Sequence, residues 1–354
     1  MTAVIFILLI GLAAANGAND VSKGVATLAG AGVARYRTAI LWGAATTLLG
    51  ALLSIPLGRG MGKLFSSGIV SASPTTAFAL AVLVGTVAWV ALASVARLPV
   101  STTHAIVGSL VGAGLLLSSD AVQWDGVLQK TLMPLLISIV VAYVLSLVLT
   151  VLATWGSRVA ARRRAAGTVA GDQPARPTGN GGGIATRTHT ETSSDPQHGS
   201  AADRLLTGLH WLSSGATSAA RGLNDTPKIA AIGGFALLPA GFTANQLALL
   251  VAAAMAVGSL LGIRVAHTLG EKVVKMSHGE GLRANLTTAV LVGAGATLAL
   301  PMSTTHVSTG AIVGSAGGDV RRINARTLRD FLIAWTVTPL FTAAVAAVVF
   351  LIAR

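Results

Sequence analysis

Long apolar runs, separated by short polar loops, dominate the chain. In the first part they cover residues 3–33, 38–57, 76–96, 105–117 and 131–155, and in the second part 205–238, 244–263, 286–300, 307–316 and 328–352. Several of these runs reach the roughly 20 apolar residues that a helix needs to cross a bilayer. The pattern therefore predicts an all-α polytopic membrane protein in a lipid bilayer.

The stretch between the two parts differs from its surroundings. It is rich in Arg, Gly, Ser, Thr and Pro and has no apolar periodicity, which is typical of a flexible hydrophilic linker. We therefore expect a first membrane repeat over residues 1–155, a linker over 156–204 and a second membrane repeat over 205–354.

Two unlike motifs each occur twice, in the same order. GANDVSK at 17–23 matches GLNDTPK at 222–228, an offset of 205 residues, and LPVSTTH at 98–104 matches LPMSTTH at 300–306, an offset of 202. A shared order at nearly one spacing indicates an internal duplication.

The basic residues give the two halves an orientation. They cluster at 35–37, 158–164, 264–283 and 321–329, and the positive-inside rule places such loops in the cytoplasm. The N- and C-termini are then outside and the linker is cytoplasmic, so the second half is inverted relative to the first. Arg59 and Lys63 would lie outside, against the rule.

The runs beside the Ser-Thr-Thr-His motifs are too short for simple spans. Residues 286–300, for example, number fifteen. A re-entrant helical hairpin with its tip at mid-membrane fits them better. The expected fold is therefore two inverted-topology repeats with re-entrant hairpins and with helices broken at 16–20 and near 224–225.

Composition narrows the classes of function. Hydrophobic residues make up 53% of the chain and charged residues 10%, against about 25% charged in soluble domains, which excludes a soluble enzyme, a disordered chain and a coiled coil. The chain has no cysteine, so thiolate metal sites and disulfides are excluded. The net charge of +13 is a topology signal, and we expect no nucleic-acid partner, no metal centre and no cofactor.

A carboxylate occurs inside an apolar run in each half. Asp20 follows Asn19, and Asp225 follows Asn224. Such a carboxylate costs about 2.5–3.5 kcal/mol in a membrane helix, so it predicts a cation or proton site. The alternative is a helix cap at the membrane edge, but two copies at equivalent places favour function.

The Ser-Thr-Thr triplets indicate helix starts that could bind an anion. Pro99 ends one helix and Ser101 can cap the next. A buried helix N-terminus favours an anion, and hydroxyl groups add donors. The candidate substrate ligands are Ser101, Thr102, Thr103, Ser303, Thr304 and Thr305. His104 and His306 either contact the anion or relay protons, or they are structural.

These four motifs resemble those of the inorganic phosphate transporter (PiT) family, which carries a Gly-Ala-Asn-Asp motif and a Ser-Thr-Thr-His-type hairpin tip in each half. The resemblance covers about 300 residues and excludes the linker. It implies import of inorganic phosphate by cation symport across the plasma (inner) membrane, commonly by a homodimer. It also implies that Asn19, Asp20, Asn224, Asp225 and the Ser-Thr-Thr groups line the site.

One difference from the family concerns the coupling ion. The family often has Asn three residues after the motif Asp, where this chain has Lys23 and Lys228. Either these lysines reach out to an interface, or each is a fixed ammonium that pairs with its Asp or contacts the anion. The second alternative favours protons, or a metal–phosphate complex with a proton, over sodium as the coupling species.

The same sequence features bear on several other functions. A sodium-coupled phosphate symporter and a sulfate permease of the same fold are the main alternatives. Sulfate is an alternative substrate because it has the same shape as phosphate. An anion channel is disfavoured, because a channel does not need the buried carboxylates. An intramembrane hydrolase lacks the Gly-x-Ser-x-Gly and His-Glu-x-x-His motifs, so we expect no enzyme activity.

Overall fold

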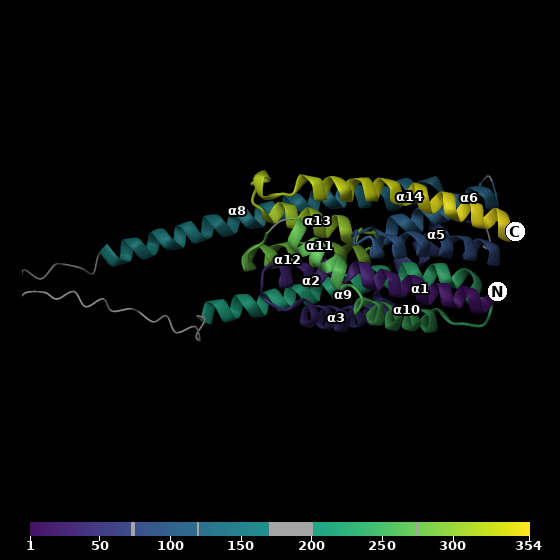
Figure 1. The fold of residues 1–354 in the computed structure, drawn as a ribbon, viewed down its shortest axis with the longest axis horizontal. Helices are drawn as coiled ribbons and strands as arrows, with labels where there is room; N and C mark the ends of the chain where they lie inside the picture. The colour runs from purple at the N-terminus through teal and green to yellow at the C-terminus, as the bar shows by residue number, and fades with distance from the viewer. Residues whose placement is uncertain (72–74, 119, 170–200, 274) are drawn as a thin grey trace, which may run out of the picture.

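The computed structural model describes residues 1–71, 75–118, 120–169, 201–273 and 275–354, and within these the regular structure is helical apart from one isolated antiparallel bridge, Val70–Val122 (Figure 1). The first half comprises α1 (Thr2–Asp20), α2 (Ser22–Gly30), α3 (Tyr36–Leu57), α4 (Arg59–Lys63), the π-helical turn η1 (Leu64–Gly68), α5 (Thr76–Val95), α6 (Thr102–Leu117), α7 (Trp124–Val127), the π-helical turn η2 (Leu128–Leu132) and α8 (Met133–Val169). The second half comprises α9 (Ala201–Leu237), α10 (Ala244–Ser259), α11 (Ile263–Lys272), α12 (His278–Thr297), α13 (Thr304–Ser315), the 3-10 turn η3 (Val320–Arg322) and α14 (Ala325–Ala353).

Several helices are long and apolar enough to cross a membrane. Among the described residues there are five such segments: Thr2–Gly30, Tyr36–Leu57, Thr76–Val95, Trp124–Arg163 and Ala325–Ala353. A sixth candidate, α10 with α11, is bent by 65°. The predicted all-α, multi-pass character of the chain is confirmed.

Helices of one half pack against helices of the other. α3 packs on α9, and α10 packs on α1. In the same way α14 covers α5 and α6, and α8 covers α12 and α13. The two halves are therefore interlocked rather than separate domains. Figure 1 shows α5 and α6 at the end that carries both termini, with α12 and α13 nearer the opposite end.

Two helical hairpins carry the Ser-Thr-Thr motifs at their tips. Two residues after the end of α5, Arg97 is in the left-handed region (φ 62°), and two residues after the end of α12, Ala299 has the same conformation (φ 55°). The next residue closes each helix, with Leu98 N donating to Ala93 O at 2.9 Å and Leu300 N to Gly295 O at 2.8 Å. This is the Schellman end of a helix, which turns the chain back at each tip.

Of the two predicted helix breaks, the first is present as a one-residue interruption, because α1 ends at Asp20 and α2 begins at Ser22, and the second, near Asn224 and Asp225, is wrong. Val21, between α1 and α2, keeps helical angles (φ −55°, ψ −30°), and α9 continues through Asn224 and Asp225. The polar side chains contact residues three or four positions away on the same helix, such as Asn16 with Asp20, so they support the helix instead of competing with its backbone.

The structure also moves the predicted boundaries of the linker (156–204) and of the apolar run at 286–300. α8 continues to Val169 and α9 begins at Ala201, so both ends of the predicted linker are helical, because Ala and Arg are strong helix formers. Residues 170–200 of that linker lie outside the described residues. α12 begins eight residues before the predicted run, where Ser277 and Glu280 form a capping box.

Glycine in each Asn-Asp motif permits a close crossing of helices. A Cβ on Gly17 of α1 would meet the carbonyl oxygen of Met255 on α10, and a Cβ on Gly222 of α9 would meet that of Thr47 on α3. The motif glycines thus bring the two repeats into backbone contact.

Gly17→Ala should therefore destabilise the protein, by about 1–3 kcal/mol, because α1 and α10 must move apart. The measurement is thermal unfolding in detergent. Gly11→Ala on the same helix is the matched control, since nothing lies within 4 Å of its Cβ position. Equal melting temperatures for the two variants would contradict the close crossing.

Candidate functional site

The two Asn-Asp motifs and the two hairpin tips meet in the interior. Two buried ion pairs form the centre. Lys23 Nζ contacts Asp20 Oδ1, with side chains 0% and 1% exposed, and Lys228 Nζ lies 3.4 Å from Asp225 Oδ1, with side chains 1% and 3% exposed. Both lysines thus pair with their aspartates, as one of the two sequence interpretations proposed, and neither extends to an interface.

Each lysine has a further oxygen partner. Lys23 Nζ donates to Asn19 Oδ1 at 2.9 Å. Lys228 Nζ instead donates across the molecule to Thr103 Oγ1, at 2.9 Å, on the tip of the first hairpin. The second ammonium therefore links its own motif to the Ser-Thr-Thr group of the other half.

The tips contact the motifs and each other. Asn16 Nδ2 donates to Thr102 Oγ1 at 2.9 Å, and Thr304 Oγ1 donates to Asp20 Oδ2 at 3.4 Å. Thr305 Oγ1 donates to Val100 O at 2.6 Å, which joins the second tip to the first. Both tips are therefore fixed against α1 and against one another.

The serines cap the helices that start at the tips. The backbone N–H of His104 donates to Ser101 Oγ at 3.3 Å, and that of His306 to Ser303 Oγ at the same distance. The predicted cap at Ser101 is confirmed. The N-termini of α6 and α13 are consequently held beside the ion pairs, where their dipoles favour negative charge.

The two motif asparagines hold the loops before these helices. Asn19 Nδ2 donates to Leu98 O at 2.9 Å, and its Oδ1 accepts from Val100 N at 3.1 Å. Asn224 Nδ2 donates to Met302 O at 3.0 Å. Their amides thus bond the peptide groups around each proline, which places the tips at the depth of the aspartates.

The two histidines lie together behind the tips. The ring centroids of His104 and His306 are 4.7 Å apart, and the His306 ring is 4.2 Å from that of Trp335. Both residues are buried. This geometry suits a proton relay and a packed structural pair equally.

Two buried polar residues escape the sequence prediction. Asn16 donates to both aspartates, at 3.2 Å to Asp20 Oδ2 and 3.4 Å to Asp225 Oδ2. Arg221 contacts Thr47 Oγ1 and donates to Ser259 Oγ at 3.2 Å, while its Nε and Nη1 have no hydrogen-bond partner within the described part of the chain. The signal that could have found them is the duplication itself, because the offset of 205 residues that relates the motifs also relates positions 16 and 221.

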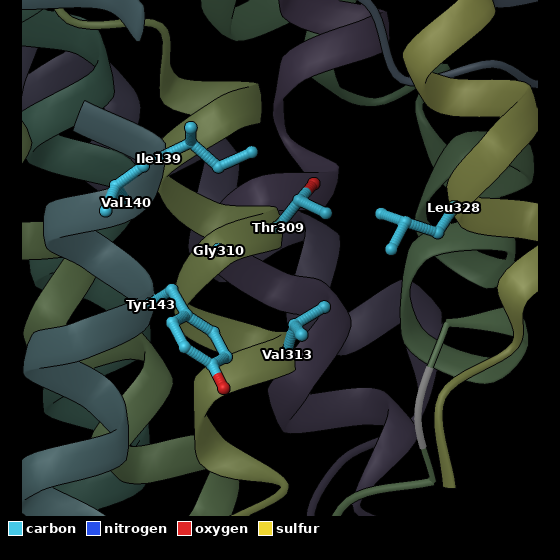
Figure 2. Close-up of a pocket in the computed structure, with 7 residues that line it drawn as sticks. All are labelled: Ile139, Val140, Tyr143, Thr309, Gly310, Val313 and Leu328. Carbon is cyan, nitrogen blue, oxygen red and sulfur yellow. The ribbon is translucent and has the colours of Figure 1, made fainter. Parts of the chain in front are cut away.

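A separate pocket of 260 Å³ lies between α8, α13 and Leu328 of α14 (Figure 2). Its lining is mostly aliphatic, with Tyr143 and Thr309 as the hydroxyl-bearing residues. It presents no charged group, so it is not a candidate for anion binding. Nor do three or more His, Cys, Asp or Glu side chains gather as a metal centre anywhere in the described ranges.

Apolar spanning helices, a duplicated motif and a buried charged centre shared by both halves define the class of secondary transporters. Comparison of the sequence with known protein families identifies the family. The model of the "Phosphate transporter family" matches residues 16–346. The chain therefore belongs to the phosphate transporter family, and it is a transporter and not an enzyme.

Relatives and a solved structure agree with this assignment. The chain is 27% identical to a probable low-affinity inorganic phosphate transporter of Rhizobium meliloti, over 94% of this chain and 92% of the relative. It is 29% identical to a protein of the same description from Mycobacterium leprae, over 95% of this chain and 74% of the relative. A solved structure described as the sodium-dependent phosphate transporter has the same fold, with a TM-score of 0.79 at 22% identity over 99% of this chain and 98% of that one.

The buried ion pair leads to a stability prediction. Lys23→Met should lower the free energy of unfolding by about 3–5 kcal/mol, because it leaves the Asp20 carboxylate buried without its cation. Adding Asp20→Asn should restore part of the loss. Both are read out as melting temperatures in detergent.

The matched control is an exposed ion pair. Arg329 and Asp330 have side chains 67% and 46% exposed, so Arg329→Met should cost about 1 kcal/mol or less. A Lys23→Met protein as stable as the Arg329→Met protein would show that the Lys23–Asp20 pair is not needed for stability.

Proposed function

We propose that this protein imports inorganic phosphate across the plasma membrane by symport with protons, or as a metal–phosphate complex with a proton. One observation carries the proposal. Three buried cations, Lys23, Arg221 and Lys228, face two buried carboxylates, Asp20 and Asp225, so the described interior has a formal excess of one positive charge. An anion that enters this centre would compensate that charge.

The hairpin tips supply the remaining parts of an anion site. Lys228 already bonds Thr103, and the N-termini of α6 and α13 adjoin the same cluster. We propose that phosphate replaces these internal contacts and accepts hydrogen bonds from the six Ser-Thr-Thr groups and the two lysines. Unpartnered donors in a buried place are costly, and a tetrahedral oxyanion satisfies several at once.

The ion pairs also suggest how protons are coupled to the anion. When Asp20 or Asp225 takes up a proton, its carboxylate becomes neutral. The paired lysine then has no negatively charged partner and becomes available to the anion. A proton that enters with each phosphate also reduces the charge that must cross against the membrane potential, which is worth about 2.3 kcal/mol per charge per 100 mV. His104 and His306 lie close enough to the tips to relay that proton or to brace them.

We further propose that the halves are inverted repeats and that both hairpins are re-entrant. The Val70–Val122 bridge brings together the segments before α5 and after α6, so the chain enters and leaves this hairpin at one end. The ends of α8 and α9 that lead to the linker project opposite both termini (Figure 1), which suits a cytoplasmic linker and external termini. A homodimer is the assembly that the resemblance to the family implies.

Sodium symport is the second candidate. It is favoured by the fold shared with the structure described as a sodium-dependent phosphate transporter. The lysines argue for the proton, because each ammonium already sits beside the carboxylate that a sodium ion would need.

Uptake of labelled phosphate into proteoliposomes tests the proposal, with sodium and proton gradients imposed separately. Uptake should persist without sodium and collapse with a protonophore. Lys23→Asn together with Lys228→Asn should weaken proton-driven uptake or make it respond to sodium. Strict sodium dependence would refute proton coupling, and equal competition by sulfate would refute phosphate selectivity.

The carboxylates should be essential for coupling. Asp20→Asn and Asp225→Asn should each abolish coupled uptake while the protein remains folded, because an amide cannot exchange a proton at this site. Size-exclusion chromatography checks the fold, and Asp125→Asn, at an exposed aspartate of α7, is the matched control. Normal uptake by both variants at every pH would make these aspartates structural.

A further inference from the structure

A large pocket beside the buried centre contains two basic residues that the proposed function leaves unused. It has a volume of 680 Å³ and lies between the end of α3, α4, the second part of α9 and the start of α10. Arg59 and Lys63 of α4 line it, together with Ser54 and Ser66. We infer that this pocket is the entry vestibule for the oxyanion, where Arg59 and Lys63 attract it before it reaches the centre; this rests on the proposed function.

The electrostatics of the pocket favour an anion. Arg59 and Lys63 are both exposed, and no carboxylate in the described part of the chain forms an ion pair with either. The described lining contains no Asp or Glu. A cleft lined by charge of one sign concentrates counter-ions and speeds their association by about 10–10³-fold.

The position of the pocket connects one end of the molecule to the centre. Its outer lining includes Leu238 and Ala244, which flank the loop where the Phe242 ring packs 5.7 Å from that of Phe6, near the N-terminus. Its inner lining includes Pro227, the residue before Lys228. The vestibule therefore runs from the end that carries the termini to the neighbour of a central ammonium.

A buried aromatic side chain lies beside that ammonium. Phe65 of η1 is 1% exposed, and its ring centroid lies 5.9 Å from Lys228 Nζ. Gly58 allows this region to approach α9, since a Cβ there would lie 3.0 Å from Pro227 Cγ. Phe65 thus lies between two vestibule residues, Lys63 and Ser66, in the sequence and beside Lys228 in space, on a short π-helical turn that continues directly from α4.

The vestibule also explains an anomaly of the charge pattern. In the predicted topology Arg59 and Lys63 lie on the outer side, where the positive-inside rule disfavours basic residues. As parts of an anion vestibule that extends from the outer end to Pro227, they are required for function rather than for topology.

The first test measures the local potential without relying on transport. The chain has no cysteine, so Ser66→Cys introduces a unique thiol in the vestibule, and Ser118→Cys, at an exposed serine after α6 and outside the lining, is its control. Purified protein is labelled with an anionic and a cationic thiosulfonate of similar size. At Ser66→Cys the ratio of the anionic to the cationic rate should fall about tenfold when Arg59→Gln and Lys63→Gln are added. An unchanged ratio, or an equal change at Ser118→Cys, would overturn the inference.

The second test measures phosphate uptake. Arg59→Gln with Lys63→Gln should raise the KM for inorganic phosphate several-fold and leave the maximal rate nearly unchanged, and added salt should reduce the difference. Lys130→Gln, an exposed lysine on η2 outside this pocket, is the control. If the unmodified protein takes up no phosphate, the proposed function fails. If it does, but the double variant has the KM of the Lys130→Gln protein, only the vestibule is refuted.

Discussion

Charge in an apolar interior requires partners, and this requirement determines where the central elements lie. The two lysines, two aspartates and one arginine of the centre are nearly inaccessible to water. Isolated in lipid or protein, each would be strongly unfavourable, so each must find an opposite charge or a polar group. The partners come from all over the chain: Lys228 reaches Thr103, and Asp20 accepts from Thr304. The hairpin tips, the motif helices and the helices that brace them are therefore positioned by the same small set of polar contacts.

The regular parts of this arrangement could be predicted from the sequence. The apolar runs, the linker region, the duplication and the pairs of motifs are visible in the residues alone. The spacing of three between Asp20 and Lys23 predicts that they share a helix face, and the structure pairs them. A serine before a Thr-Thr pair predicts a cap, and Ser101 is one. These features are local, so the sequence carries them without reference to the rest of the fold.

The features that the sequence did not reveal depend on contacts between distant segments. Asn-Asp and Pro227 are signals that end helices in water, yet α9 continues through them, because helices on either side hold it in place. Position 16 holds Asn and position 221 holds Arg, so a search for identical motifs passes over the pair. This difference also makes the two halves electrically unequal at the centre, although their motifs match.

The interlocked packing of the halves has a consequence for how the protein is made. During synthesis α1 emerges well before α10, and α5 and α6 emerge before α14, the last helix, which covers them. The first half therefore enters the membrane with its charged motif and its hairpin lacking the surfaces that will enclose them. Contacts between residues so far apart in the chain also form slowly. The faces of α5 and α6 that α14 covers therefore stay open during synthesis until α14 has been inserted.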